Sequence, residues 1–397
     1  MVNPSPPPRE AFLPVDLEEL VEDLAGRGSE RVREAGLGRF CRLYTALHRA
    51  RLEESNAGLK RAYRVFDPDR DTVTALEVDE AERGRLLELL RRDTAELLRQ
   101  ANYIEITPES LTASLNKTSP RGLAVSVDLD EFEELSLHYR GEYTRLEETR
   151  DWRKLGLAKQ SHETVVYRRL FLLLKLKRRA DDGPVPERVF LKLFRDVPQP
   201  DLEMILPNTR VRMRVFDKLK LGVTGGGGTA GGVAATVTKI GAAASPLTWA
   251  LALAGLAGVL WRQIAKVLAQ RTRYMADLAQ QLYFCNLDNN FGALMHLAEQ
   301  AQSEESKEAI LAYAHLAAKG PMSQAELDAS VESFLQETYG FDADYEVVDG
   351  LDKLRRAELL IERDDGRFEV PPPEEAYARL DREWDAMFEA GEPVTSG

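Results

Sequence analysis

The sequence predicts an α+β protein with a helical N-terminal region, a small antiparallel sheet, a transmembrane helical hairpin and a C-terminal winged-helix-like domain. Three observations lead to this fold class. Apolar residues recur at helical spacing over residues 15–102. Apolar and charged residues alternate, as they do in strands, in segments between 133 and 221. Residues 218–276 contain no Asp or Glu, although acidic residues are frequent on either side.

The charge of the chain is unevenly distributed. Its 397 residues carry a net charge of −13, with −6 over 1–160, +11 over 161–276 and −18 over 277–397. A basic middle between acidic ends favours attraction of the middle alone to an anionic surface. A solvated basic face without a ligand is the alternative. The two cysteines, Cys41 and Cys285, offer no disulfide framework and fit a reducing compartment.

The N-terminal region is expected to be helical after a disordered, Pro-rich lead. A spacing of i, i+3, i+4 and i+7, typical of a helix with one buried face, is seen at Leu17, Leu20, Val21 and Leu24. Thr107 followed by Pro108 indicates the start of a further helix. Residues 122–130 then alternate in the manner of a strand.

An antiparallel sheet is expected next. Its predicted strands are 133–148, 165–177, 188–195 and 209–221. In the second of these, Leu172 and Leu174 share one face, while the opposite face mixes Phe with Lys and Arg. The turn at 181–184 predicts a hairpin between the second and third strands.

Two apolar arms, 221–238 and 241–261, predict the transmembrane hairpin. The second arm has 21 residues and no ionisable group, and as a helix it would span roughly 31 Å, about one hydrocarbon thickness. The first arm holds seven glycines, each unfavourable in a helix by roughly 1 kcal/mol relative to Ala. A re-entrant first arm, or a pair of soluble Gly/Ala-rich helices, is the alternative. The residues expected to pack the two arms together are Gly222, Gly226, Gly228, Gly232, Ala250, Ala254 and Gly258.

Basic residues flank both arms, and only Lys239 lies between them. By the positive-inside rule both long soluble parts face the cytoplasm, which predicts a location in the cell inner membrane. Cationic side chains near a membrane surface attract anionic headgroups. The side chains expected to contact anionic lipid are Lys175, Lys177, Lys192, Arg212, Arg214, Lys218, Lys220, Arg262, Lys266, Arg271 and Arg273.

The C-terminal part is expected to be mostly helical. Residues 286–290 (NLDNN) read as a break between two helices, because cap and turn residues explain them better than a ligand site does. Ser323 and Glu326 form a capping box that opens a helix. Helices are predicted up to about 302 and over 304–319, 324–338, 345–357 and 376–388, with two short strands within 359–370.

The sequence predicts that the chain is divided into seven segments. They are a lead (1–14), a helical domain (15–130), a sheet domain (131–220), a membrane hairpin (221–261), a helical connector (262–302), a winged-helix-like domain (303–373) and a C-terminal helix with its tail (374–397). The winged-helix-like domain lies in the strongly acidic third of the chain. Because DNA affinity comes largely from neutralising phosphates, docking of a protein is the preferred role for this domain.

Three stretches together resemble an uncharacterised family. They are VYRRLFLLLKLK at 166–177, VFLKLFRDVPQPDLEMILPNTRVRM at 189–213 and LYFCNLDNNFGALMHL at 282–297. The chain is similar here to the domain-of-unknown-function family that includes the mitochondrial transmembrane protein 143. The resemblance implies a membrane hairpin between soluble domains and supplies no catalytic residues. Since residues 1–14 show no organelle-targeting pattern, a bacterial-type cell membrane is expected instead of mitochondria.

The sequence contains no catalytic constellation that we recognise. Gly226, Gly228 and Gly231 match a dinucleotide fingerprint, but the next acidic residue, Asp277, is too distant to bind a ribose. The segment 67–78 lacks the Gly and Glu that a calcium loop requires. The five histidines include no zinc-binding pair at i, i+4. We therefore expect no cofactor and no metal site, and a protein that is not an enzyme.

The predicted function is that of a non-enzymatic integral membrane protein. Its basic sheet would contact anionic lipid, and its acidic winged-helix-like domain would dock a protein partner. The alternatives are a membrane-tethered winged-helix DNA-binding regulator, and an enzyme acting on lipid or nucleotide through an unrecognised site. The expected partners are membrane lipids and a protein, without nucleic acid. A second copy of the chain, packed through the small-residue hairpin, is a further hypothesis.

Overall fold

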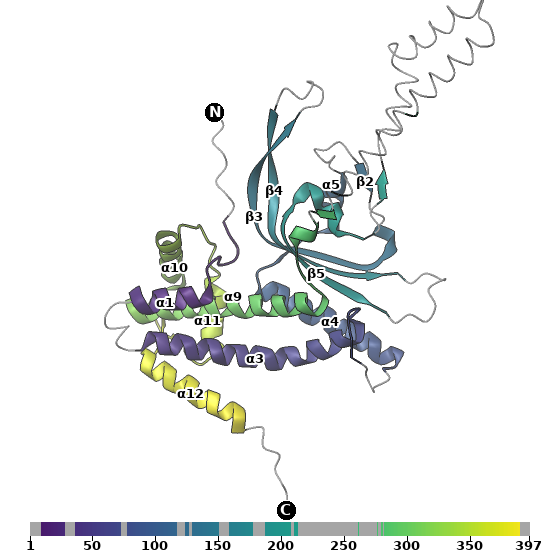
Figure 1. The fold of residues 1–397 in the computed structure, drawn as a ribbon. Helices are drawn as coiled ribbons and strands as arrows, with labels where there is room; N and C mark the ends of the chain where they lie inside the picture. Colours follow the sequence, from purple (N-terminus) through teal and green to yellow (C-terminus); the bar gives the residue numbers. More distant parts are fainter. Residues whose placement is uncertain are drawn as a thin grey trace, which may run out of the picture.

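Long helices and a five-stranded antiparallel sheet form two parts of the molecule that lie against each other (Figure 1). The α+β class expected from the sequence is confirmed. The computed structural model describes residues 9–27, 36–72, 78–116, 124–126, 129–150, 159–177, 187–207, 210–212, 261, 276, 279–280 and 282–389.

One helix lies at the centre of the helical part. The main helices are α1 (Leu17–Arg27), α3 (Leu37–Phe66), α4 (Glu80–Gln100), α9 (Asn290–Lys319) and α12 (Pro373–Glu389). Helices α1, α3 and α4 all pack on α9, and α12 packs on α3. The apolar stripe predicted for the first helix is buried, with Leu20 fully enclosed. The helical N-terminal region is therefore confirmed.

The sheet is antiparallel throughout, with the strand order β1-β3-β4-β5-β7. Its strands are β1 (Ile104–Glu105), β3 (Phe132–Arg150), β4 (Lys159–Leu176), β5 (Val189–Pro198) and β7 (Asn286–Asn289). Three predicted strands correspond to β3, β4 and β5, and the predicted pairing of the second with the third is confirmed. The strand expected at 209–221 is described only as β6 (Arg210–Arg212), which pairs with β2 (Ala124–Ser126), and its remainder lies outside the described residues.

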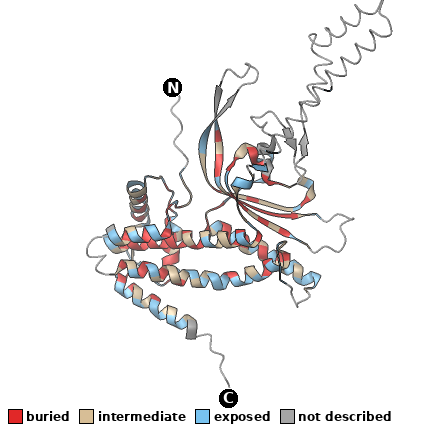
Figure 2. Cartoon of the chain, viewed as in Figure 1, coloured by how far each residue is buried: buried red, intermediate tan, exposed pale blue. Residues whose placement is uncertain are grey.

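Both faces of the sheet are covered at β4 and β5, which carry most of its buried residues (Figure 2). Phe171 and Leu173 of β4 pack with side chains of α4 and α9 on one face. Leu170 and Leu172 pack on the other face with the short helices α5 (Pro108–Asn116) and η3 (Gln199–Ile205); a second 3-10 turn, η1 (Leu129–Glu131), precedes β3. The face that mixes Phe with Lys and Arg is therefore covered by helices and is not open to a charged surface.

The segment expected to be a break between helices is a strand. Residues 286–289 form β7, which pairs with the edge of β5. The chain then turns at Asn290, whose φ is 51°, and its side-chain oxygen accepts hydrogen bonds from Tyr63 and from the backbone N–H of Leu191, both at 3.2 Å. Helix α9 follows without interruption to Lys319. The boundary expected at 302/303 thus falls inside one continuous helix.

The C-terminal part adds two helices and a small hairpin after α9. They are α10 (Gln324–Tyr339), α11 (Val347–Arg356), β8 (Ile361–Glu362) and β9 (Phe368–Glu369). Met322, between α9 and α10, forms an antiparallel bridge with Phe368 of the hairpin. This order of helices and strands is the one expected from the sequence, and its assignment as a winged-helix-like domain stays a prediction. The capping box of Ser323 and Glu326 at the start of α10 is confirmed.

The membrane interpretation has to be corrected. Within the part of the chain that the structure describes, no helix has both the length and the apolar composition needed to cross a bilayer. The long helices α3 and α9 carry charged residues along their length, which hydrocarbon disfavours. The predicted transmembrane hairpin, the integral membrane function and the inner-membrane location were therefore wrong on this finding. Residues 221–260, which hold nearly all of both arms, lie outside the described residues, and Trp261 is exposed.

Candidate functional site

The middle of α9 carries buried charges that hold the N-terminal segment and the sheet in place. Glu304 is fully buried and forms ion pairs with Arg140 of β3 and with Lys307 one turn along α9. The backbone N–H of Leu13 donates to Glu304 Oε2 at 3.0 Å. Lys307 Nζ donates to the carbonyl oxygens of Leu13 and Val15, at 2.5 and 3.2 Å. These hydrogen bonds fix the N-terminal segment that precedes α1 against α9.

A second buried group on α9 attaches helix α11. Glu308 is ion-paired with Lys353 of α11, whose Nζ also lies 3.4 Å from Glu305 Oε1. Asn102 Nδ2 donates to Glu308 Oε1 at 3.2 Å, and Tyr345 Oη donates to the Glu308 carbonyl oxygen at 2.7 Å. Burial raises the pKa of the Glu308 carboxyl to about 7, although Lys353 opposes the rise. Together, the two buried groups fix the position of α9 against its neighbours.

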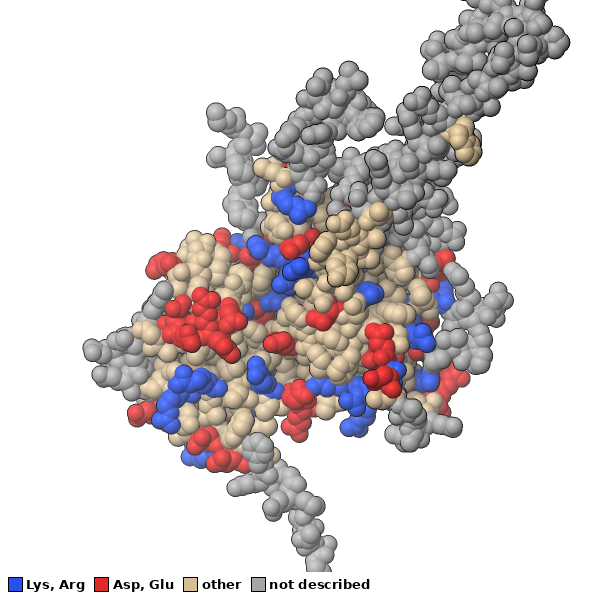
Figure 3. Space-filling view, viewed as in Figure 1, with Lys and Arg blue, Asp and Glu red and all other residues tan. Residues whose placement is uncertain are grey.

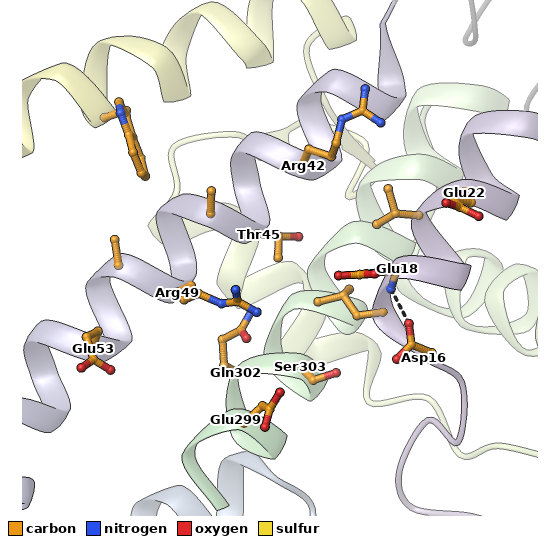
Figure 4. A pocket seen from close by; sticks show the side chains of 15 residues that line it. Asp16, Glu18, Glu22, Arg42, Thr45, Arg49, Glu53, Glu299, Gln302 and Ser303 are labelled. Carbon is orange, nitrogen blue, oxygen red and sulfur yellow. Dashed lines mark hydrogen bonds between the residues drawn. The ribbon is translucent and has the colours of Figure 1, made fainter. Parts of the chain in front are cut away.

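A groove of about 820 Å³ lies between α1, α3 and α9 (Figure 4). Helix α1 forms its acidic wall. Asp16 caps the helix, because its Oδ1 accepts the backbone N–H of Glu18 at 2.8 Å. Glu18 and Glu22 are one turn apart, and both are exposed. Among the described residues neither carboxylate has an ion pair or a side-chain hydrogen bond.

Helix α3 forms the opposite wall of the groove. Arg42 and Arg49 are seven residues apart, or about two turns, so they lie on the same face. Both guanidinium groups are exposed and have no ion pair with any residue that the structure describes. In the close-up, Arg49 lies towards Gln302 of α9 (Figure 4). Acidic side chains gather over α1, and basic side chains gather over the adjoining part of α3 (Figure 3).

The floor and the ends of the groove are partly apolar. Leu17 and Val21 contribute from α1, Ala46 and Ala50 from α3, and Trp384 from α12. The α9 side contributes Glu299, Gln302 and Ser303. At the far end Glu53 is tied to Lys60 of its own helix and is therefore compensated. The groove thus combines an apolar floor with one acidic and one basic wall.

The groove offers a ligand a binding surface. The residues that line it include no His and no Cys, so its hydroxyl groups have no adjacent imidazole to activate them as nucleophiles. Its exposed charges lie at the rim, where solvent screens them. What this arrangement offers a ligand is contact with an apolar floor, together with charge complementarity on two sides.

The residues predicted to contact lipid do not form one described surface. Lys175 is buried, with Nζ 2.8 Å from Glu133 and 3.4 Å from Glu187, so it is not available to a headgroup. Lys177 is exposed, and Lys192 Nζ donates to Asn289 Oδ1 at 2.9 Å. Arg212 lies on β6, but its side chain is not described. Also outside the described residues are Arg214, Lys218, Lys220, Arg262, Lys266, Arg271, Arg273 and the packing set Gly222, Gly226, Gly228, Gly232, Ala250, Ala254 and Gly258.

Sequence reasoning missed the groove, although part of its signal was present. The i, i+4 spacing of Glu18 and Glu22 and the i, i+7 spacing of Arg42 and Arg49 each place like charges on one helix face. Those spacings could have indicated two charged walls. That the two walls face each other across a cavity depends on how α1 and α3 pack on α9, which no local pattern shows.

Comparison with known proteins gives a family match over part of the chain. No solved structure matches the chain. The matched region begins just before β4, includes β5 and β7 and ends at the first turn of α9, so it contains much of the sheet and none of the groove. It covers roughly a third of the chain. Residues 157–292 match the family described as protein of unknown function (DUF3754).

Proposed function

We propose that the protein is a docking module that holds a charged, amphipathic helical segment of a protein partner in the groove between α1 and α3. The observation that carries the proposal is the pair of oppositely charged walls. Glu18 and Glu22 face the groove from one side and Arg42 from the other, and none of them is paired within the described chain. A binding partner that brings both signs of charge would compensate both walls at once.

The groove indicates the chemistry of that partner. An amphipathic helix would lay its apolar stripe on Val21, Ala46 and Trp384, the mode by which grooves of this kind bind helices. Lys or Arg along one edge of the helix would face α1, and Asp or Glu along the other edge would face α3. Flanking charges of this kind set orientation and partner choice in coiled coils. Because each exposed pair is worth only about 0–1 kcal/mol, we expect the charges to contribute specificity more than affinity.

In the proposed docking function, the C-terminal helix α12 forms part of the binding site. The sequence suggested a protein partner for the preceding winged-helix-like domain (303–373), whereas here it is α12 that lines the groove, through Trp384. Arg51 of α3 forms an ion pair with Glu383, the preceding residue of α12. Helix α12 is therefore held where it forms one end of the proposed docking site.

Site-specific photo-crosslinking in cells tests the proposal. A benzophenone side chain placed at Ala46, in the groove, should crosslink to a partner segment whose sequence has an apolar stripe flanked by opposite charges. The matched control is Ala57, which is exposed on the same helix but does not line the groove. Crosslinks from Ala46 that fall only on other segments of this chain, or that are the same as those from Ala57, would contradict the docking function.

We also propose a family relationship finer than the match itself, namely to the family that includes the mitochondrial transmembrane protein 143. Its support is that residues 166–177 and 189–213 lie inside the matched region and 282–297 overlaps its end. An alignment of that family with this chain tests the relationship. It should extend through all three stretches without interruption, and an alignment confined to one of them would argue against it.

A further inference from the structure

A second, smaller cavity lies between α3 and α11, on a different face of α3 from the groove. Its volume is about 240 Å³. Residues Tyr44 and His48 come from α3, Lys353 and Arg356 from α11, and Glu305 from α9. The groove uses other positions of α3, so the two sites share a helix but no lining residue.

Two polar side chains line this cavity without a hydrogen bond to a residue that the structure describes. Tyr44 is only 6% exposed, and its hydroxyl makes no hydrogen bond within the described chain. Its ring is stacked on that of His48, with the ring centroids 6.2 Å apart. His48 Nε2 is buried and likewise lacks a hydrogen-bond partner. Buried polar atoms without a partner are rare in native proteins, so His48 Nε2 is a position at which a ligand could accept or donate a hydrogen bond.

The charges around the cavity are predominantly positive at His48. Burial, together with the nearby charges of Lys353, Arg51 and Arg356, lowers the pKa of His48 to about 4. Arg51 is already paired with Glu383 of α12. Glu305 is the one carboxylate among the lining residues, and Lys353 engages it at 3.4 Å. Arg356 is exposed and has no ion pair with a described residue.

We propose that this cavity binds a small oxyanion, the phosphate or carboxylate group of a soluble small molecule, through Tyr44, His48 and Arg356. A phenol and a neutral imidazole can each donate one hydrogen bond, and a guanidinium offers several in a planar fork that matches oxyanions. Lys353 is shared between Glu305 and Glu308, which leaves Tyr44, His48 and Arg356 as the lining donors that no described residue engages. The volume accommodates the anionic group with a small substituent and excludes a large ligand.

Titration calorimetry of the full chain with inorganic phosphate and, separately, with acetate tests this site. Saturable binding of one of these anions is expected. Arg356→Gln should weaken it about tenfold or more, since a hydrogen bond to a charged group is worth roughly 1.5–3 kcal/mol. Tyr44→Phe keeps the aromatic ring and should weaken binding several-fold. The matched control is Arg355→Gln, because Arg355 is paired with Asp352 and Glu362 and does not line the cavity.

The outcomes separate cleanly. Binding that depends on Arg356 and Tyr44 but not on Arg355 supports the site, and the anion that binds identifies the chemistry. Absence of saturable binding by either anion overturns the proposal. So does equal affinity in Arg356→Gln and Arg355→Gln. Because the groove shares no lining residue with this cavity, failure here leaves the crosslinking result at Ala46 unaffected.

Discussion

Charged residues occupy two neighbouring regions of the helical part. In one region they are buried and paired, and in the other they are exposed and have no ion pair with a described residue. On α9, Glu304 and Glu308 are buried, and each is bound by cationic and hydrogen-bonding partners. In the groove, Glu18 and Arg42 are exposed and have no ion pair within the described chain. A buried charge without a partner is strongly destabilising, whereas an exposed one is not. The interior charges therefore belong to folding, and the groove charges are available for binding.

Removal of Glu304 should give the largest effect and tests the interior half of this comparison. Glu304→Ala leaves the guanidinium of Arg140 and the ammonium of Lys307 buried without their carboxylate. We expect the free energy of unfolding to fall by about 3–5 kcal/mol, measured by urea denaturation. The control is Glu299→Ala, five residues earlier on α9 but exposed, which should stay within about 0.5 kcal/mol. Equal losses in the two variants would remove the distinction between the regions.

The buried carboxyl of Glu308, in the interior region of this comparison, should make the free energy of unfolding depend on pH. Its pKa is raised by burial from 4.5 to about 7, so the folded chain holds this proton more tightly than the unfolded chain does. Its contribution to stability is therefore present below about pH 4.5 and is lost as the pH rises to about 7, by up to about 1.4 kcal/mol per pH unit. Glu308→Gln does not titrate, so the stability of the wild type relative to this variant should fall across that window. Parallel pH profiles of the two proteins would show that Glu308 does not titrate there.

The close approach of α11 to α9 depends on one glycine. A Cβ at Gly350 would lie 2.3 Å from Tyr345 Oη and 3.1 Å from the carbonyl oxygen of Glu308. Gly350→Ala must therefore displace the hydroxyl that donates to that carbonyl, and overpacking of this kind costs about 1–3 kcal/mol. Gly58→Ala on α3 is the matched control, because a Cβ there meets open space, and it should stabilise by about 0.5–1 kcal/mol. Thermal unfolding of both variants measures the two effects, and a neutral Gly350→Ala would contradict the tight packing.

How far the sequence predicts this fold depends on whether a signal is local. The strand pattern of β4 is local, because Leu172 and Leu174 share one face while Phe171 and Lys175 share the other. The start of α10 is predictable because its capping box is contained in four residues. The composition of residues 286–289 predicts a break between helices, since Asn and Asp favour turns. Their strand conformation comes from pairing with the edge of β5, about 90 residues earlier in the chain.

The candidate site was less predictable than the fold. Glu304 and Lys307 read as an ordinary i, i+3 surface pair, and only the approach of Arg140 from the sheet and of Leu13 from the N-terminal segment shows that they are buried. The basic residues that flank the glycine-rich arms predict a membrane-inserted hairpin, and this pattern contains no information about the groove. Composition identifies which residues are charged, whereas tertiary packing decides which of them remain accessible.

Substitutions in the acidic wall of the groove should change the free energy of unfolding least and the binding of a partner most. In the double variant Glu18→Lys and Glu22→Lys, no described partner is lost, so the free energy of unfolding should change by no more than about 0.5 kcal/mol. Crosslinking of a partner from Ala46 should nevertheless fall strongly, because a basic α1 would repel the basic edge of the docked helix. Glu19→Lys is the control, since Glu19 is exposed on the same helix but does not line the groove. A large loss of stability in the double variant would mean that these carboxylates serve the fold as Glu304 does, and unchanged crosslinking would mean that the acidic wall does not select the partner.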